Sequence, residues 1–211
     1  MWLAPPTFRS RRIPRPSRKS WRAASAATSA VDLRNAHLTG VNLSGADLRD
    51  AKLDGARLMG VNLSGARFDG ASLSGAAFIG TNINSISLRG ANTSGLTMTG
   101  VSLAHMDLRG VDVRSLLNSC TGCNLAGANL RDADLHGIHL VGANLSGADL
   151  SGANLSDAVL NGANLHNASF HGANLRNASF TGASFAGSDL RGADTSGAHF
   201  EGADLRGQAL P

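Results

Sequence analysis

The stretch that decides the fold runs from Val31 to Gly65 and reads VDLRN AHLTG VNLSG ADLRD AKLDG ARLMG VNLSG. A unit of five residues repeats along it, with a large apolar residue at the centre and glycine at the end of most units. We call the central residue position i, so Leu33, Leu38 and Leu43 occupy position i in the first three units. Self-similarity at a fixed period indicates an architecture built by stacking equivalent units.

The period extends over most of the chain, in two registers. Residues 31–115 hold 17 units (85 residues in fives), and residues 118–207 hold 18 units (90 residues in fives). Leu116 and Leu117 stand between the two blocks and shift the phase of the second. We therefore predict one repeat domain over residues 31–207, with a phase break at 116–117 and a short tail at 208–211.

The glycines mark the end of each unit. All 26 glycines of the chain fall at position i+2, and six of the nine remaining i+2 positions hold Asn or Asp. These six are Asn35, Asp50, Asp132, Asp157, Asn167 and Asn177. Glycine, asparagine and aspartate are the residues that best tolerate a positive φ. The pattern predicts a tight corner at the end of each repeat.

The other positions indicate which side chains point inward. Position i is mostly Leu or Phe and position i−2 mostly Ala, whereas positions i−1 and i+1 are polar. This alternation is typical of an extended segment rather than a helix. Aromatic residues make up only 4% of the chain, so the core has to consist of many smaller side chains in a regular array.

Units such as ANLSG at 143–147 and ADLSG at 148–152 resemble the pentapeptide-repeat family, and the resemblance covers about five-sixths of the chain. It implies an all-β solenoid: a right-handed quadrilateral parallel β-helix of about nine coils, with four pentapeptides in each coil. At the ~4.8 Å spacing of paired strands, the rod would be about 40 Å long.

On this arrangement, residues 20 apart in sequence stack on one another. We expect two ladders of outward asparagines whose side chains hydrogen-bond along the rod. The ladders are Asn42, Asn62 and Asn82 in the first block, and Asn124, Asn144 and Asn164 in the second. Each coil buries its core only against its neighbours, so stability should be nearly one-dimensional.

The least regular part of the repeat is residues 81–117. Ser85 and His105 replace corner glycines there, and Leu116 and Leu117 interrupt the phase. Two interpretations are open. The irregularity is either structural, with a two-residue bulge at a corner and compensating packing, or a surface that His105, Leu116 and Leu117 offer to a protein partner.

The sequence predicts no enzyme, cofactor or metal site. Cys120 and Cys123 form a CxxC motif, which taken alone suggests redox or metal chemistry. In register, however, both occupy core positions, and zinc would need two further ligands that the repeat does not supply. We expect two buried core cysteines, and whether they pair is left open. No Ser, His and carboxylate set, and no phosphate-binding loop, departs from the repeat.

Charge is divided between the two parts of the chain. Residues 1–30 hold seven of the 19 basic residues and no acid, which leaves 12 basic against 15 acidic residues, a net charge of −3 for the rest. This segment is interpreted as a basic disordered arm, with an organellar transit peptide or a misassigned start as alternatives. We expect a cytoplasmic protein, or an organellar one, for example in a plastid, if the arm is a transit peptide. No apolar run is long enough to span a membrane.

The function predicted from these features is a non-catalytic structural or protein-interaction module with an unknown protein partner. The alternative comes from the resemblance: some family members mimic DNA, bind DNA gyrase or topoisomerase, and protect it from inhibitors. That activity needs a continuous acidic face, but one expected column reads Asp47, Arg67, Ser87 and Asp107. The nearest to an acidic column reads Asp134, Asn154, Asn174 and Asp194.

Two further expectations concern partners of the rod. The mildly acidic repeat body should not bind nucleic acid directly. Only four residues follow Gly207, too few for a capping helix. An uncovered last coil predicts an end-on homodimer, and the basic arm could cap the opposite end.

Overall fold

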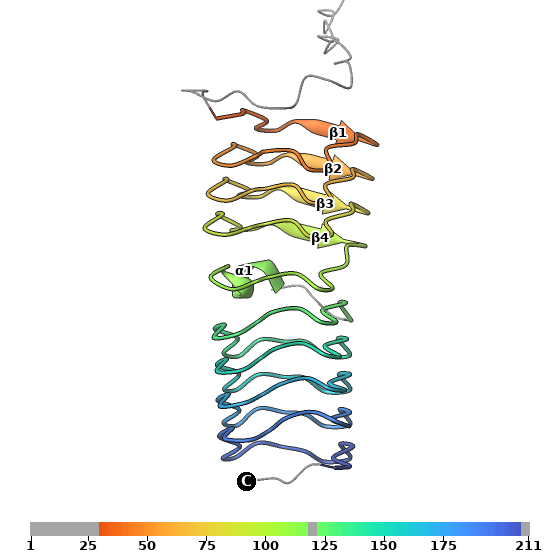
Figure 1. The fold of residues 1–211 in the computed structure, drawn as a ribbon, viewed down its shortest axis with the longest axis vertical. Coiled ribbons are helices and arrows are strands. Elements are labelled where there is room, and N and C mark those ends of the chain that lie inside the picture. Colours follow the sequence, from red (N-terminus) through yellow and green to blue (C-terminus); the bar gives the residue numbers. More distant parts are fainter. Residues whose placement is uncertain (1–29, 118–121, 208–211) are drawn as a thin grey trace, which may run out of the picture.

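The computed structural model describes residues 30–117 and 122–207. The chain winds into a straight rod of stacked coils (Figure 1). Four short strands, β1 (His37–Thr39), β2 (Arg57–Met59), β3 (Ala77–Ile79) and β4 (Thr97–Thr99), pair in parallel in the order β1-β2-β3-β4. One helix, α1 (Val113–Leu117), lies within the described ranges.

The register confirms that four repeats make one coil. Leu38 pairs with Leu58, and Leu58 with Phe78, each 20 residues further along the chain. The same offset of 20 relates the isolated bridges on the other sides of the rod, such as Asn42 with Asn62 and Asp47 with Arg67. The rod is therefore four-sided, and each side is a column of repeats.

We number the four sides of the rod as faces 1 to 4 and list the position-i residues of each. An outward residue is assigned to the face that contains its own repeat. Face 1 carries Leu33, Leu53, Leu73, Thr93, Leu135, Leu155, Leu175 and Thr195. Face 2, which contains β1 to β4, carries Leu38, Leu58, Phe78, Met98, Leu140, Leu160, Phe180 and Phe200. Face 3 carries Leu43, Leu63, Ile83, Leu103, Leu125, Leu145, Leu165, Phe185 and Leu205. Face 4 carries Leu48, Phe68, Leu88, Leu108, Leu130, Leu150, Phe170 and Leu190.

The corners adopt the predicted left-handed conformation. All 26 glycines have a positive φ, and so do eight of the nine other residues at position i+2. Ser85 and His105, which are not Asn or Asp, are among these eight. The ninth is Ser115, which lies inside α1. The corner is thus missing at one place in the described rod, where a helix replaces it.

The core runs along the axis of the rod and consists of the predicted residues. Side chains at positions i and i−2, such as Leu145 and Ala148, are buried over nearly the whole length. Most consecutive coils hydrogen-bond to each other through the backbone: Leu145 N–H donates to Asn164 O (2.8 Å), and Asn164 N–H donates to Ala143 O (2.9 Å). Among the described residues, the step from residues 81–100 to residues 101–117 lacks such bonds. Since paired coils are neighbours, coupling between distant coils has to pass through those in between.

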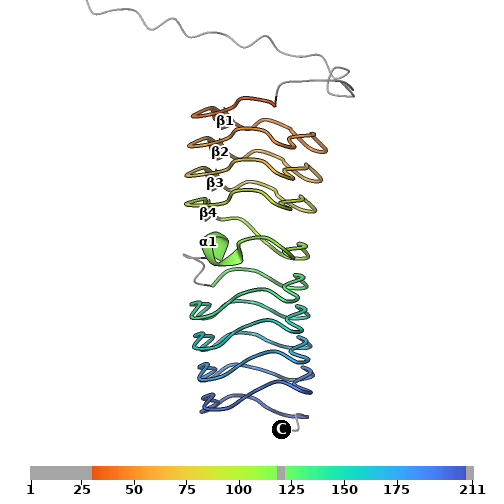
Figure 2. The same cartoon turned by 90° about the vertical axis from the view of Figure 1, so that its left-hand side faces the viewer.

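Helix α1 accommodates the phase break. Across it, Asp107 pairs with Asn129, an offset of 22 rather than 20. The sequence led us to expect a two-residue bulge at a corner, but the structure has a five-residue helix instead. Asp112 caps its start, accepting hydrogen bonds from the backbone N–H (3.1 Å) and hydroxyl (2.7 Å) of Ser115. Seen from the side, α1 interrupts the otherwise even stack of coils (Figure 2).

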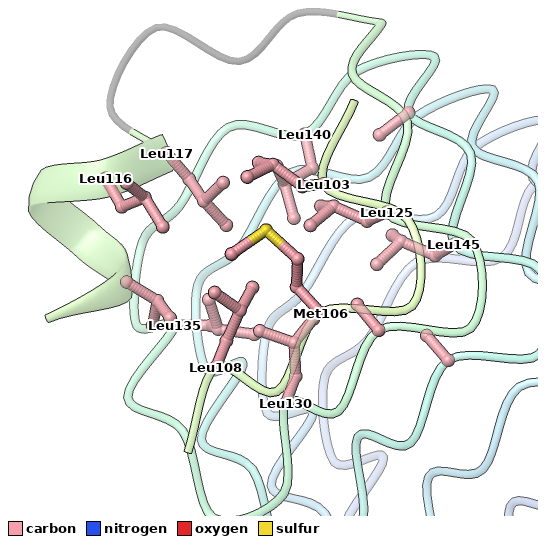
Figure 3. Close-up of a cluster of buried hydrophobic side chains, with 14 of the residues drawn as sticks. Leu103, Met106, Leu108, Leu116, Leu117, Leu125, Leu130, Leu135, Leu140 and Leu145 are labelled. Carbon is pink, nitrogen blue, oxygen red and sulfur yellow. The ribbon is translucent and has the colours of Figure 1, made fainter. Parts of the chain in front are cut away.

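The two residues of the phase break belong to the core. Leu116 is 5% exposed and Leu117 is fully buried. Figure 3 shows both leucines directed at the buried cluster that holds Met106 and Leu108. Apolar burial therefore holds α1 against the rod.

No helix among the described residues is long and apolar enough to cross a membrane. Three sequence-based predictions fall outside those residues: the basic arm predicted over residues 1–30, of which only residue 30 is described, the placement of Cys120, and the tail at 208–211.

Candidate functional site

The sides of the rod differ sharply in charge. The repeat body holds 27 charged residues (12 basic and 15 acidic), and 23 of them lie on faces 1 and 4. The remaining four are Arg57 and Glu201 on face 2, and Asp204 and Arg206 on face 3. Between Asn42 and Phe200, faces 2 and 3 therefore carry one formal charge, that of Arg57. We call faces 2 and 3 the uncharged side, and faces 1 and 4 the charged side.

On face 3, the outward residues form one polar column. At position i−1 it reads Asn42, Asn62, Asn82, Ser102, Asn124, Asn144, Asn164, Ser184 and, in the last described coil, Asp204. The Nδ2 of Asn124 donates to Ser102 Oγ across the phase break (3.1 Å), and the Nδ2 of Asn144 donates to Asn124 Oδ1 (3.3 Å). The Oδ1 of Asn144 also accepts the N–H of Ser146 (3.2 Å). The predicted ladder of amide hydrogen bonds thus forms in the second block, through Asn124, Asn144 and Asn164. In the first block, Asn42, Asn62 and Asn82 stack through backbone bridges, and each amide oxygen accepts a backbone N–H of its own repeat.

On face 2, several outward side chains are apolar or β-branched. Met59 is 45% exposed and Val141 is 40% exposed, and Ile79 and Val159 lie partly exposed in the same sheet or its continuation. Exposed apolar groups on a flat, paired backbone are a common feature of contact surfaces. Face 2 therefore adds apolar contact area to the hydrogen-bonding column of face 3.

The acidic residues are largely neutralised by arginines. In five Asp-x-Arg units, the arginine donates two hydrogen bonds to the aspartate of its own repeat, as Arg109 does to Asp107 through Nε (2.8 Å) and Nη2 (2.7 Å). The five pairs are Asp32–Arg34, Asp47–Arg49, Asp107–Arg109, Asp189–Arg191 and Asp204–Arg206. Two-point pairs of this kind are strong and directional. Four of the five pairs lie on the charged side, where arginines therefore interrupt the acidic residues, and this is not the continuous acidic face expected of a DNA mimic.

These pairs predict how stability depends on pH. The hydrogen bonds from arginine lower the pKa of Asp32, Asp47 and Asp204 to about 2, compared with about 3.9 for an unfolded chain. A lowered pKa in the folded state gives stability that is present above about pH 4 and is lost as the pH falls to about 2. We expect the midpoint temperature of unfolding to fall over this interval, and only modestly because the pairs are exposed.

Carboxyl NMR signals followed during an acid titration would check this expectation directly. Arg49→Gln should raise the pKa of Asp47 and leave that of Asp32 unchanged, because the second pair is intact. A normal Asp47 pKa in the unmodified protein would contradict the expectation.

The structure separates the three residues of the predicted partner surface. His105 is exposed at the corner after face 3, where its ring lies over the backbone of Gly127. Leu116 and Leu117 lie on α1 and are buried. This placement favours the packing interpretation for the two leucines. His105 stays a candidate contact residue at the edge of the uncharged side.

Cys123 packs partly buried against the core and is disulfide-bonded. The sequence predicted a buried core cysteine at this position, whereas Cys123 is only partly buried, and the question of pairing that the sequence left open is answered for Cys123, whose sulfur is oxidised. Cys120 is the other cysteine of the sequence and lies outside the described residues. In the part of the chain that the structure describes, no group of three or more His, Cys, Asp or Glu side chains could hold a metal ion.

A four-sided rod with a left-handed corner after nearly every fifth residue defines a solenoid of five-residue repeats. The model of the Pentapeptide repeats family matches residues 29–65, 56–95, 119–157, 143–182 and 168–207, and the chain belongs to this family. Its fold is a right-handed quadrilateral parallel β-helix, as the sequence resemblance implied.

Solved structures of other family members are similar to this chain. HetL, a protein involved in heterocyst differentiation regulation in the cyanobacterium Nostoc sp. strain PCC 7120, is 30% identical; the match covers 86% of this chain and 92% of HetL, with a TM-score of 0.45. QnrB1, a plasmid-mediated fluoroquinolone resistance protein, is 20% identical over 84% of this chain and 92% of its own, with a TM-score of 0.42. A protein of the Arabidopsis thaliana thylakoid lumen is 25% identical over 70% and 66%, with a TM-score of 0.22. No curated protein matches this chain.

Proposed function

We propose that this protein is a non-catalytic module that binds a protein partner through its uncharged side. The observation that carries the proposal is the confinement of 23 of the 27 charged residues to faces 1 and 4. The centres of protein interfaces are depleted of charge, because an ion that loses its water must be paired again. A partner docked on faces 2 and 3 would bury very few ions.

The size of this side is sufficient for a stable complex. A rod about 40 Å long with faces about 10 Å wide offers on the order of 800 Å² over two faces, the area that each partner contributes to a standard interface. Asn144 and its column supply fixed donors and acceptors, while Met59 and Val141 supply apolar contact. We expect a partner surface that is itself uncharged and rich in polar groups.

A matched pair of charge insertions tests the proposal. Val141→Glu places a carboxylate on the uncharged side, and Ser94→Glu places one at the equivalent i+1 position on face 1. Tagged variants would be used to capture proteins from an extract of the source organism, with quantification by mass spectrometry. Val141→Glu should reduce retention of the partner about tenfold, since a desolvated unpaired charge costs several kcal/mol.

The control variant Ser94→Glu should retain the partner at the level of the unmodified protein. Equal retention by both variants, or a loss confined to Ser94→Glu, would contradict binding through faces 2 and 3. Circular dichroism of both variants would show that the rod is intact.

The same capture experiment separates two other modes of association. Phe200 and Leu205 are only partly buried in the last described coil, which favours an end-on homodimer. Such a dimer would be detected as an untagged copy of this protein captured from the extract. The DNA-mimic alternative requires a gyrase or topoisomerase subunit among the captured proteins. The Asp–Arg pairs of the charged side favour it less than an interaction through the uncharged side.

A further inference from the structure

Helix α1 changes the partners of one particular arginine. The chain contains six Asp-x-Arg units, and five of them form the two-point pairs described above. The sixth unit, Asp112–Arg114, does not. Asp112 caps α1 and accepts both of its side-chain hydrogen bonds from Ser115. Among the described residues, Arg114 instead pairs with the carboxylate of Asp134. Arg114 Nη1 lies 3.7 Å from Asp134 Oδ2, which is beyond hydrogen-bond distance.

The side chain of Arg114 borders a cavity. A hollow of about 330 Å³ lies beside α1 and is lined by Arg114, Ser115, His136, Gly137, Ile138 and His139. His136 belongs to face 1 and His139 to face 2, so the two histidines flank the corner at Gly137. Ile138 is buried and provides the apolar part of the wall. On a rod whose other sides are built from regular columns, this hollow is a consequence of the phase break.

The chemistry of the lining favours a negatively charged ligand. Arg114 offers guanidinium N–H groups that match two oxygens of an anion at once. His136 Nδ1 lies 3.0 Å from both the carbonyl oxygen and the hydroxyl oxygen of Ser156, which leaves Nε2 as the ring nitrogen that is not engaged there. Two exposed carboxylates stand at the rim: Asp134 near Arg114, and Asp157 at 3.5 Å from His136 Nδ1. Neither forms a two-point pair with the lining residues.

We propose that this cavity binds a tetrahedral oxyanion, a phosphate or sulfate group, with Arg114 as the principal contact and His136 and His139 on either side of it. The volume accommodates an anion that carries a small organic substituent against Ile138. The site lies on the corner between faces 1 and 2, so His139 also borders the uncharged side, whereas Arg114 and His136 belong to the charged side.

Two arginine variants of the full chain test the site. Arg114→Gln removes the guanidinium from the cavity, whereas Arg109→Gln removes the same charge from an intact pair one repeat earlier. The probes are inorganic phosphate, inorganic sulfate and, as a planar comparison, acetate. Binding would be followed by calorimetry and by the NMR signals of the histidine rings.

Phosphate or sulfate should shift the ring signals of His136 and His139, and acetate should do so less. Arg114→Gln should weaken phosphate or sulfate binding about tenfold or more, as expected for losing a hydrogen bond to a charged group, while Arg109→Gln should weaken it less than twofold. The relative affinities for phosphate and sulfate identify which group the cavity prefers. Equal losses in the two variants, or histidine ring signals that phosphate and sulfate leave unchanged, would overturn the proposal.

Discussion

Replacing Leu117 with aspartate is expected to destabilise the protein by about 4 kcal/mol, because the new carboxylate would be buried without a partner. Leu117 is fully buried in the cluster around Met106 and Leu108. Proteins of this size are stable by only about 5–15 kcal/mol, so the loss is a large share of the total. Urea unfolding monitored by circular dichroism would measure it.

The control for this substitution is Thr99→Asp, on the exposed surface of β4 in the coil that precedes α1. It should change the free energy of unfolding by less than about 1 kcal/mol. The comparison also decides between the two interpretations of the phase break. If Leu117→Asp were as stable to urea as Thr99→Asp, Leu117 would not belong to the core, and the contact-surface interpretation would stand.

The second large effect is expected for Phe180→Ala. The ring of Phe180 is fully buried and lies among three others, with centroids 5.1 Å from Phe185, 5.3 Å from Phe200 and 6.3 Å from Phe170. Removing it leaves a cavity in the centre of the C-terminal coils, and we expect a loss of about 4 kcal/mol. Phe200→Ala should cost less, about 2 kcal/mol, because Phe200 is only partly buried.

The location of this effect is as informative as its size. In a solenoid each coil is stabilised by its neighbours, so hydrogen exchange should accelerate in the coils around Phe180 before it does so in β1 to β3. Mass spectrometry of exchanged peptides would show the gradient. Uniform acceleration from Leu33 to Leu205 would indicate that the whole rod unfolds as one cooperative unit.

The five-residue repeat is sufficient to predict the architecture from the sequence. Each corner depends on one local property, the tolerance of a positive φ, and the residue type at position i+2 determines that property. The columns of Asp47, Arg67 and Ser87, and of Asp134, Asn154 and Asn174, follow from the spacing of 20 and are confirmed. The two-sided distribution of charge follows from the same spacing once the columns of the two blocks are joined.

The candidate sites are much harder to predict from the sequence. Asp112–Arg114 resembles Asp107–Arg109 in sequence, yet one forms a pair and the other does not. The signal that separates them is Ser115, a residue at position i+2 that is neither Gly, Asn nor Asp. Its hydroxyl and backbone N–H compete with Arg114 for the carboxylate of Asp112.

Local residue preferences therefore account for the corners, the inward leucines and the four-sided rod, because each repeat meets nearly the same surroundings. The phase break is different, since its conformation depends on what lies beneath it. Burial of Leu116 and Leu117 in the rod holds the chain in a helix, and the helix in turn redirects Asp112, releases Arg114 and joins Ser102 to Asn124. The Ser102–Asn124 contact spans an offset of 22, and the packing of the folded rod, rather than the five-residue pattern, selects that offset.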